Sequence, residues 1–460
     1  MINKYLSELL DHALNNGLIE KCDEIYAINR VLHLIGGESF ERAEYTPHKS
    51  LETLLGDILD IADKNNRLPV NTVTYRDILS ADIMDVFTPK PSVLNNKFFE
   101  HYSKSPKSAT DYFYNLSKST NYIMTERINK NIVWKTKTEK YGDLDLSINL
   151  SKPEKDPRDI AMAKNAAPSA DYPRCALCKE NVGFEGNANK APRANHRIIP
   201  VTLSGEEWFL QYSPYGYFNE HCILLEGEHK PMNVNRKTLE RIVGFVEQYP
   251  HYILGSNAGL PIVGGSILTH DHYQGGCYEF PIAKQPTIKT FVLDGYNDVS
   301  VGIVDWVMST IRLASKNKES LISLADKIRI SWDNYTDEEN NIIAYTDAPH
   351  NAITPIARVR DGVFELDLIL RNNRTNEEYP YGIFHVHEEY HNVKKENIGL
   401  IEAMGLAVLP PRLVTQFGEL NDEVKTYIGT AFEKLLENCA VFKDNEKGRK
   451  GFERFINSLK

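Results

Sequence analysis

Apolar residues near the start of the chain recur at the spacing of an amphipathic helix. The first apolar stripe consists of Ile2, Leu6, Leu9, Leu10 and Ala13. A second stripe follows in SLETLLGDILDIAD. Residues 88–110 carry several proline, serine and asparagine residues, which predicts a connector. We therefore expect residues 1–115 to form a helical N-terminal region that ends in this connector.

A period of two replaces the helical period after residue 116. In DLDLSINL, aliphatic and polar residues alternate, which predicts a strand with one buried face. WFLQY and HCILLEGEH predict further strands, and an apolar stripe from Leu239 to Val246 predicts a helix. FELDLILRNN repeats the pattern of DLDLSINL. We therefore expect two related units, residues 116–290 and 291–460, the second of which ends in helices.

Composition narrows the class of protein. The chain has 460 residues, 42% of them hydrophobic and 25% charged, as in a water-soluble globular protein. Its net charge of -10 argues against nucleic acid as the main partner. The opening MINKYLSELLDHAL lacks the apolar core of a secretion signal, and no apolar run reaches the roughly 18 residues of a membrane span. The six cysteines follow no regular spacing, which favours a reduced cytoplasmic setting.

The run from His270 to Gln274 is the strongest candidate for chemistry. On a strand, residues two apart point to the same face, so His270 and His272 would share one site. Pairs of glycines precede and follow the run, where they would let the backbone approach an anionic ligand. Neutral imidazole is a competent nucleophile near pH 7, because its pKa is ~6.5. The alternative is that both histidines are structural or bind only a metal.

Gln274 lies two residues beyond His272 and shares its predicted face. A glutamine can hold a phosphate oxygen by a hydrogen bond, but it cannot exchange a proton at neutral pH. A nucleotide attached to His272 would then be transferred to a phosphate acceptor and would not be released by attack of water. The pattern therefore favours group transfer over hydrolysis.

Several segments together carry a resemblance to a known family. They include YGDLDLSINLSKPEKDP, YFNEHCILLEGEHKPMNV, GGSILTHDHYQGG and FHVHEEYHNVKKENIGLIEAMGLAVLPPRL. Nearly the whole chain resembles the second type of galactose-1-phosphate uridylyltransferase, a branch of the histidine-triad superfamily. The resemblance implies an α+β fold with a duplicated, antiparallel half-barrel core, and a cytoplasmic homodimer. It also implies a ping-pong reaction that moves UMP from UDP-glucose to galactose 1-phosphate through His272, with Gln274 holding the phosphoryl oxygens.

Six further residues match substrate-binding positions of the family: Asn257, Ser266, Lys394, Lys395, Lys152 and Lys155. The resemblance implies phosphate and backbone-ordering contacts for the first two and hexose-phosphate contacts for the next two. The last two would reach the active site of a dimer partner. The alternatives are a turn residue at Asn257 and solvated surface charge at the lysines.

Two metal sites are also implied by the resemblance. The first is a zinc site at Cys175, Cys178, His229 and His270, and Cys-x-x-Cys spacing by itself suits such a site. His221 is a competing third ligand, and two ordinary thiols are the alternative. The second site, typically iron, would use His350, His385 and His387, with Glu279 as the nearest acid. These histidines could instead be a polar remnant of the duplication.

Two other functions compete with uridylyl transfer. One is a histidine-triad dinucleoside-polyphosphate phosphorylase or nucleotide hydrolase, and the other is a non-catalytic nucleotide or metal sensor. Gln274 disfavours hydrolysis, and an intact His272 disfavours the sensor. The expected ligands are UDP-sugars and hexose 1-phosphates, with no organic cofactor.

Overall fold

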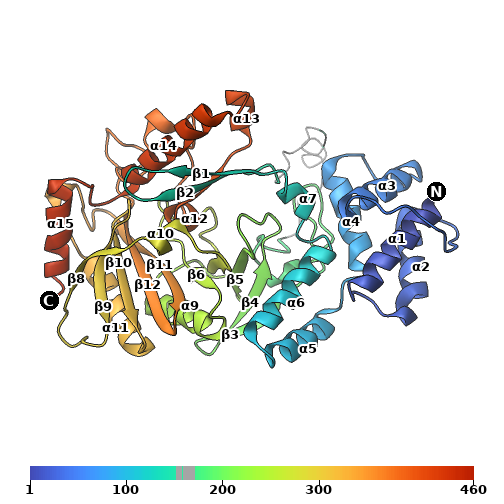
Figure 1. Ribbon diagram of the computed structural model, residues 1–460, viewed down its shortest axis with the longest axis horizontal. Coiled ribbons are helices and arrows are strands. Elements are labelled where there is room, and N and C mark those ends of the chain that lie inside the picture. Colours follow the sequence, from blue (N-terminus) through green and yellow to red (C-terminus); the bar gives the residue numbers. More distant parts are fainter. Residues whose placement is uncertain (152–157, 159–170) are drawn as a thin grey trace.

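The computed structural model describes residues 1–151, 158 and 171–460. Lys152 and Lys155 lie outside the described residues. Figure 1 shows the first helices at one end of an elongated molecule and the C-terminal helix at the other. Between them lie a large sheet and a smaller one, so the expected α+β class is confirmed. None of the described helices combines the length and the apolarity that crossing a lipid bilayer requires.

The large sheet has ten strands in the order β3-β4-β5-β7-β6-β11-β12-β10-β9-β8, and neighbouring strands run antiparallel. The strands of its first half are β3 (Ile199–Leu203), β4 (Glu206–Tyr212), β5 (Cys222–Glu226), β6 (Ile253–Gly255) and β7 (His272–Gly276). Those of its second half are β8 (Thr287–Phe291), β9 (Ser300–Val304), β10 (Thr310–Ser315), β11 (Asn351–Arg360) and β12 (Val363–Asn372).

The two halves of this sheet repeat one topology. Each half consists of three strands, a helix and two more strands, and in each half the fifth strand lies between the third and the fourth. The helices are α9 (Arg236–Gln248) and α11 (Lys318–Asp333). β6 pairs with β11 and joins the halves. The expected duplication is confirmed.

The prediction that DLDLSINL and FELDLILRNN are equivalent strands of the two halves was wrong. DLDLSINL forms β2 (Asp143–Ile148), which belongs to a separate three-stranded sheet with β1 (Ile132–Lys137) and β13 (Leu406–Leu409). FELDLILRNN forms β12, whose topological counterpart is β7 and not β2. The similar alternation of the two segments reflects only that each strand buries a face, which any such strand must do.

The remaining α-helices of the described residues are α1 (Ile2–Asn15), α2 (Glu24–Ile35), α3 (Leu51–Lys64), α4 (Val73–Asp85), α5 (Pro91–Tyr102), α6 (Pro106–Ser119), α7 (Thr125–Ile128), α10 (Pro281–Lys284), α12 (Leu400–Ala403), α13 (Arg412–Phe417), α14 (Asp422–Cys439) and α15 (Glu446–Asn457). Short 3-10 turns are η1 (Lys21–Asp23), η2 (Lys179–Asn181), η3 (Glu338–Asn340) and η4 (Glu388–Tyr390).

The predicted connector at residues 88–110 is instead largely helical. Pro91 and Pro106 each occupy the first position of a helix, α5 and α6. A proline there costs no hydrogen bond, because the first amides of a helix have no partner within it. The side chain of Ser105 caps α6 by accepting from the backbone N–H of Ser108. The prolines and the serine thus start helices where we expected them to interrupt structure.

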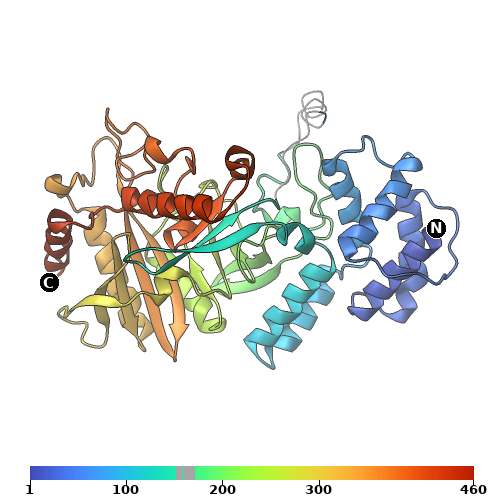
Figure 2. The same ribbon diagram turned by 45° about the horizontal axis from the view of Figure 1, so that its top comes forward.

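The large sheet buries both of its faces. One face carries α9 and α11, and its apolar core continues into the N-terminal helices. A second core on the other face includes Ile253, Ile356 and Ile369 of the large sheet, residues of the small sheet, and α14. Figure 2 shows α14 lying across this side of the molecule. This second face is the one that carries the candidate site.

Candidate active site and metal centre

His272 is the first residue of β7, between β5 and β6. Its Nδ1 lies 2.9 Å from the backbone oxygen of His270. A carbonyl oxygen only accepts hydrogen bonds, so Nδ1 carries the proton and Nε2 keeps its lone pair. Among the described residues Nε2 has no protein partner, and it is not one of the buried unpaired atoms. The lone pair therefore remains open to an incoming group.

Burial also keeps the His272 ring neutral. The side chain is 5% exposed, and loss of solvent lowers the pKa of His272 to about 4. The hydrogen bond to the His270 carbonyl opposes this shift, but it is the smaller effect. At neutral pH the ring is a neutral base of fixed tautomer, which is the form a nitrogen nucleophile requires.

Gln274 follows on the same face of β7, and its partner comes from outside the motif. Its Oε1 accepts a hydrogen bond from Nε2 of His221, at 3.1 Å. His221 immediately precedes β5, the strand that pairs with β7. We expected His221 as a competing metal ligand, but it is not in the cluster of metal-ligating side chains.

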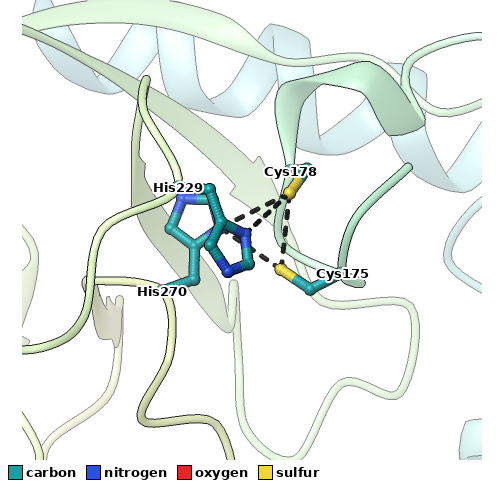
Figure 3. A group of neighbouring side chains, drawn as sticks. All are labelled: Cys175, Cys178, His229 and His270. Carbon is teal, nitrogen blue, oxygen red and sulfur yellow. Dashed lines mark hydrogen bonds between the residues drawn. The ribbon is translucent and has the colours of Figure 1, made fainter. Parts of the chain in front are cut away.

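Four other side chains converge from three segments of the chain, as Figure 3 shows. They are Cys175, Cys178, His229 and His270, whose ligand atoms all lie within 4.8 Å of one another. The two sulfurs are 3.5 Å apart. Each sulfur lies 3.2 Å from a histidine Nδ1: Cys175 from His270 and Cys178 from His229. The ligands of a tetrahedral zinc site lie roughly 3.3–3.8 Å apart, so this set fits such a metal.

The surroundings of the cluster also fit a metal. His270 Nε2 lies 2.9 Å from the backbone oxygen of Glu226, which leaves Nδ1 unprotonated and facing the sulfurs. A hydrogen bond of this kind commonly orients metal-binding histidines. Asn181 donates to the backbone oxygens of both cysteines and closes their turn. Without a cation, burial raises the pKa of Cys175 to about 11, so a metal ion would be needed to hold it as thiolate.

Asp271 points to the opposite face of β7, toward α9. Its carboxylate lies 3.4 Å from Arg241 Nη1, which also donates to the Tyr273 hydroxyl. Burial raises the pKa of Asp271 to about 7, and the charge of Arg241 opposes that shift. The sequence assigned no role to this residue. The structure makes it an anchor that ties the back of the motif to a helix.

The paired glycines around the motif are explained by packing. A Cβ on Gly275 would collide with the backbone oxygen of Ile253, and one on Gly276 with that of Glu220. A Cβ on Gly264 would collide with the backbone oxygen of Ala258. We expected these glycines to admit a ligand. They also let β7 and the preceding loop lie close to neighbouring backbone, and the approach of a ligand stays a prediction.

Asn257 and Ser266 lie in the loop between β6 and β7. The side-chain oxygen of Asn257 accepts from the backbone N–H of Leu400 at 2.8 Å, so the residue fastens this loop to the start of α12. Ser266 is exposed. Lys394 is buried and lies 3.2 Å from Glu402, whereas Lys395 is exposed.

The structure does not bring His350, His385 and His387 together as metal ligands. They form no cluster of metal-ligating atoms in the described part of the chain. His350 contacts Asn373 and Thr346, His385 contacts Asn397, and His387 contacts the backbone of Ile383. Glu279 lies near Arg360, at 3.8 Å. The second His-x-His follows β12 and does not begin a strand as the first does, which explains the different environment.

Comparison with known proteins matches both parts of the chain to one family. Residues 17–231 match the N-terminal domain of galactose-1-phosphate uridyl transferase, and residues 240–432 match its C-terminal domain. Galactose-1-phosphate uridylyltransferase of Clostridium acetobutylicum is 48% identical over the full length of both chains. The enzyme of Bacillus subtilis is 46% identical, over 100% of this chain and 98% of its own.

Among solved structures, yeast Ap4A phosphorylase Apa2 aligns over 70% of this chain and 92% of its own, with 12% identity and a TM-score of 0.38. That likeness is too distant to bear on activity. The family matches and the full-length relatives, by contrast, agree with each other. The chain belongs to the galactose-1-phosphate uridylyltransferase family.

Proposed function

We propose that the protein transfers UMP from UDP-glucose to galactose 1-phosphate by way of His272. In the first step the lone pair of Nε2 attacks the α-phosphorus of UDP-glucose. The new N–P bond replaces the bond to the leaving oxygen, and glucose 1-phosphate departs. In the second step a phosphate oxygen of galactose 1-phosphate attacks the same phosphorus. The N–P bond breaks, UDP-galactose leaves, and the imidazole returns to its neutral form.

One observation carries this proposal above all: the His270 carbonyl fixes the proton of His272 on Nδ1 and frees Nε2. Gln274 supplies the second support, since its amide shares the face of His272 and offers no titratable proton. These features suit a nucleotidyl-histidine that waits for a phosphate acceptor. The full-length relatives are named galactose-1-phosphate uridylyltransferases, which supports transfer of a uridylyl group to galactose 1-phosphate.

The cluster of Cys175, Cys178, His229 and His270 would hold zinc, on our proposal. The donor set of two sulfurs and two imidazoles suits that ion. A bound zinc would stabilise the thiolates and cross-link the segments that carry its ligands. His270 would then serve twice, since its side chain ligates while its backbone oxygen orients His272.

Other features remain predictions. Lys394 and Lys395 are proposed to contact the hexose phosphate, and Asn257 and Ser266 to make phosphate and backbone-ordering contacts. The homodimer, the cytoplasmic location and the roles of Lys152 and Lys155 are further expectations from the family resemblance.

Incubation with UDP-glucose alone tests the proposal. Release of one equivalent of glucose 1-phosphate, with the uridylyl group retained on the protein, supports it. Subsequent addition of galactose 1-phosphate should discharge the protein and yield UDP-galactose. Continuous release of UMP would show a hydrolase, and the absence of any release would favour a non-catalytic sensor.

A further inference from the structure

His221 is a buried histidine that contacts Gln274 of the proposed site. Within the part of the chain that the structure describes, it does not belong to the cluster of metal-ligating side chains. It is 3% exposed. Its ring contacts two aromatic rings: it stacks on Tyr217, with centroids 5.2 Å apart, and lies tilted against Phe218, with centroids 4.5 Å apart. Its Nε2 lies 3.1 Å from Oε1 of Gln274. Aromatic contacts thus hold the His221 ring, which directs one nitrogen at Gln274.

The surroundings of His221 determine which partner donates. Its Nδ1 is buried and has no hydrogen-bond partner among the described residues. An orphaned buried N–H is rarer than an orphaned acceptor, so Nδ1 is the bare nitrogen and Nε2 carries the proton. Burial lowers the pKa of His221 to about 4, which keeps the ring in this neutral form. Nε2–H therefore donates to the amide oxygen of Gln274.

We infer that His221 is a positioning residue, which fixes the side-chain amide of Gln274 so that its NH2 group faces the phosphoryl oxygens. Without this hydrogen bond, the amide of Gln274 could turn over and present its oxygen to them. An oxygen facing the phosphoryl group would repel the negative charge that grows in the transition state, whereas an NH2 group stabilises it. The inference rests on the proposed role of Gln274.

The amide nitrogen of Gln274 is free to act in this way. It has no protein partner among the described residues, and it is not one of the buried unpaired atoms. β7 places Gln274 two residues after His272, on the same face. His221 thus binds the amide oxygen of Gln274, and the NH2 group of Gln274 is left to donate to the substrate.

Two substitutions separate hydrogen bonding from packing. His221→Phe keeps an aromatic ring in contact with Tyr217 and Phe218 but removes the hydrogen-bond donor. His221→Gln offers an NH2 donor near the position of Nε2. We expect His221→Phe to slow both half-reactions by about 10-fold through kcat, with KM for UDP-glucose changed by less than about 3-fold, because the lost contact acts mainly in the transition state. His221→Gln should recover to within about 3-fold of the wild-type kcat.

A double-mutant cycle makes the test decisive. Gln274→Ala alone should lower kcat by about 100-fold, as expected for loss of a transition-state donor. Adding His221→Phe to Gln274→Ala should then cause no further loss, because the group that His221 positions is already absent. Metal content and melting temperature of each variant would be measured beside the rates.

Three outcomes would overturn the inference: wild-type kcat in His221→Phe, failure of His221→Gln to recover activity when it folds normally, or an additive loss in the double variant. An additive loss would assign His221 a purely structural role in its loop. If the wild-type protein formed no uridylyl-histidine, the proposed function itself would fail. If it did form one and His221→Phe reacted at the normal rate, only the role of His221 would fail.

Discussion

At the scale of single residues, hydrogen bonds to neighbouring groups decide what each side chain of the motif can do. His272 and His270 are both imidazoles, but His272 leaves Nε2 free whereas His270 turns Nδ1 toward two sulfurs. In each case the other nitrogen meets a backbone oxygen, and that contact fixes the tautomer. Two backbone carbonyl groups therefore suit His272 to its proposed role as nucleophile and His270 to its proposed role as metal ligand.

Replacement of the nucleophile should abolish the reaction. His272→Asn removes the lone pair of Nε2, and the amide nitrogen that replaces the ring is not a nucleophile. We expect uridylyl transfer from labelled UDP-glucose to protein to fall at least 1000-fold. His33→Asn, at an exposed histidine of α2, is the matched control and should label like the wild type. Normal labelling of folded His272→Asn protein would disprove the assignment.

At the scale of elements, β7 lies unusually close to the strands and loop that surround it. Gly275 faces the backbone of β6, and Gly276 faces the backbone of the loop before β5. A side chain at either position would push β7 away from its neighbours. Because His272 and Gln274 are part of this strand, close packing also sets their position.

Enlarging Gly275 should therefore disturb both stability and rate. We expect Gly275→Ala to lower the free energy of unfolding by about 1–3 kcal/mol through overpacking. Gly244→Ala is a matched control, because a Cβ there meets open space within α9. It should be neutral or stabilising by up to about 1 kcal/mol. Urea titration of both variants measures the difference, and equal stability would contradict the packing argument.

The metal cluster joins three segments of the chain and should stabilise the His270–Gln274 motif, which supplies one of its ligands. Cys175→Ser should remove bound metal, lower the melting temperature and slow uridylylation, because His270 loses its restraint and its carbonyl orients His272. Cys22→Ser, at an exposed cysteine outside the cluster, is the control. Metal analysis and thermal melting are the measurements. Full metal content in Cys175→Ser would exclude this residue as a ligand.

At the scale of the whole molecule, the repeated half-sheets form one continuous sheet, but only the first half begins its fifth strand with the motif. In the second half the fifth strand is β12, in which Asp367 forms buried ion pairs with Arg312 and Arg358. The N-terminal helices pack in the same apolar core as the large sheet. Arg197, just before β3, links the two by donating hydrogen bonds to Asp85 and to the backbone oxygen of Pro89. The helical region therefore contributes to the core of the fold.

Buried neutral histidines should make the stability of the protein depend on pH. The pKa of His221 is lowered to about 4, whereas in the unfolded chain it is ~6.5. Between these values the unfolded state binds a proton that the folded state does not, so stability is full above pH ~6.5 and falls as the pH drops toward 4. The slope is ~1.4 kcal/mol per pH unit for one such group. The free energy of unfolding of His221→Phe should therefore fall less steeply between pH 6 and 4.5, as urea titrations would show. Parallel slopes would contradict a neutral buried His221.

The sequence by itself determined the features that depend on neighbours along the chain. The spacing of His270, His272 and Gln274 placed three side chains on one face, and the Cys175–Cys178 spacing indicated a metal site. The resemblance then supplied His229 and the family. Strand and helix patterns predicted β4, β5, β12 and α9, although the helix-starting prolines of α5 and α6 were mistaken for a connector.

Only the tertiary structure decided what depends on contacts between distant segments. His221 and Gln274 are 53 residues apart, and nothing in their spacing shows that two paired strands bring them together. The same holds for Arg241 with Asp271, for the close backbone around Gly275, and for the different partners of His350 and His385. Short-range periodicity reports which face of an element is buried. It does not report which partner lies on the other side, because strand pairing and packing set that partner.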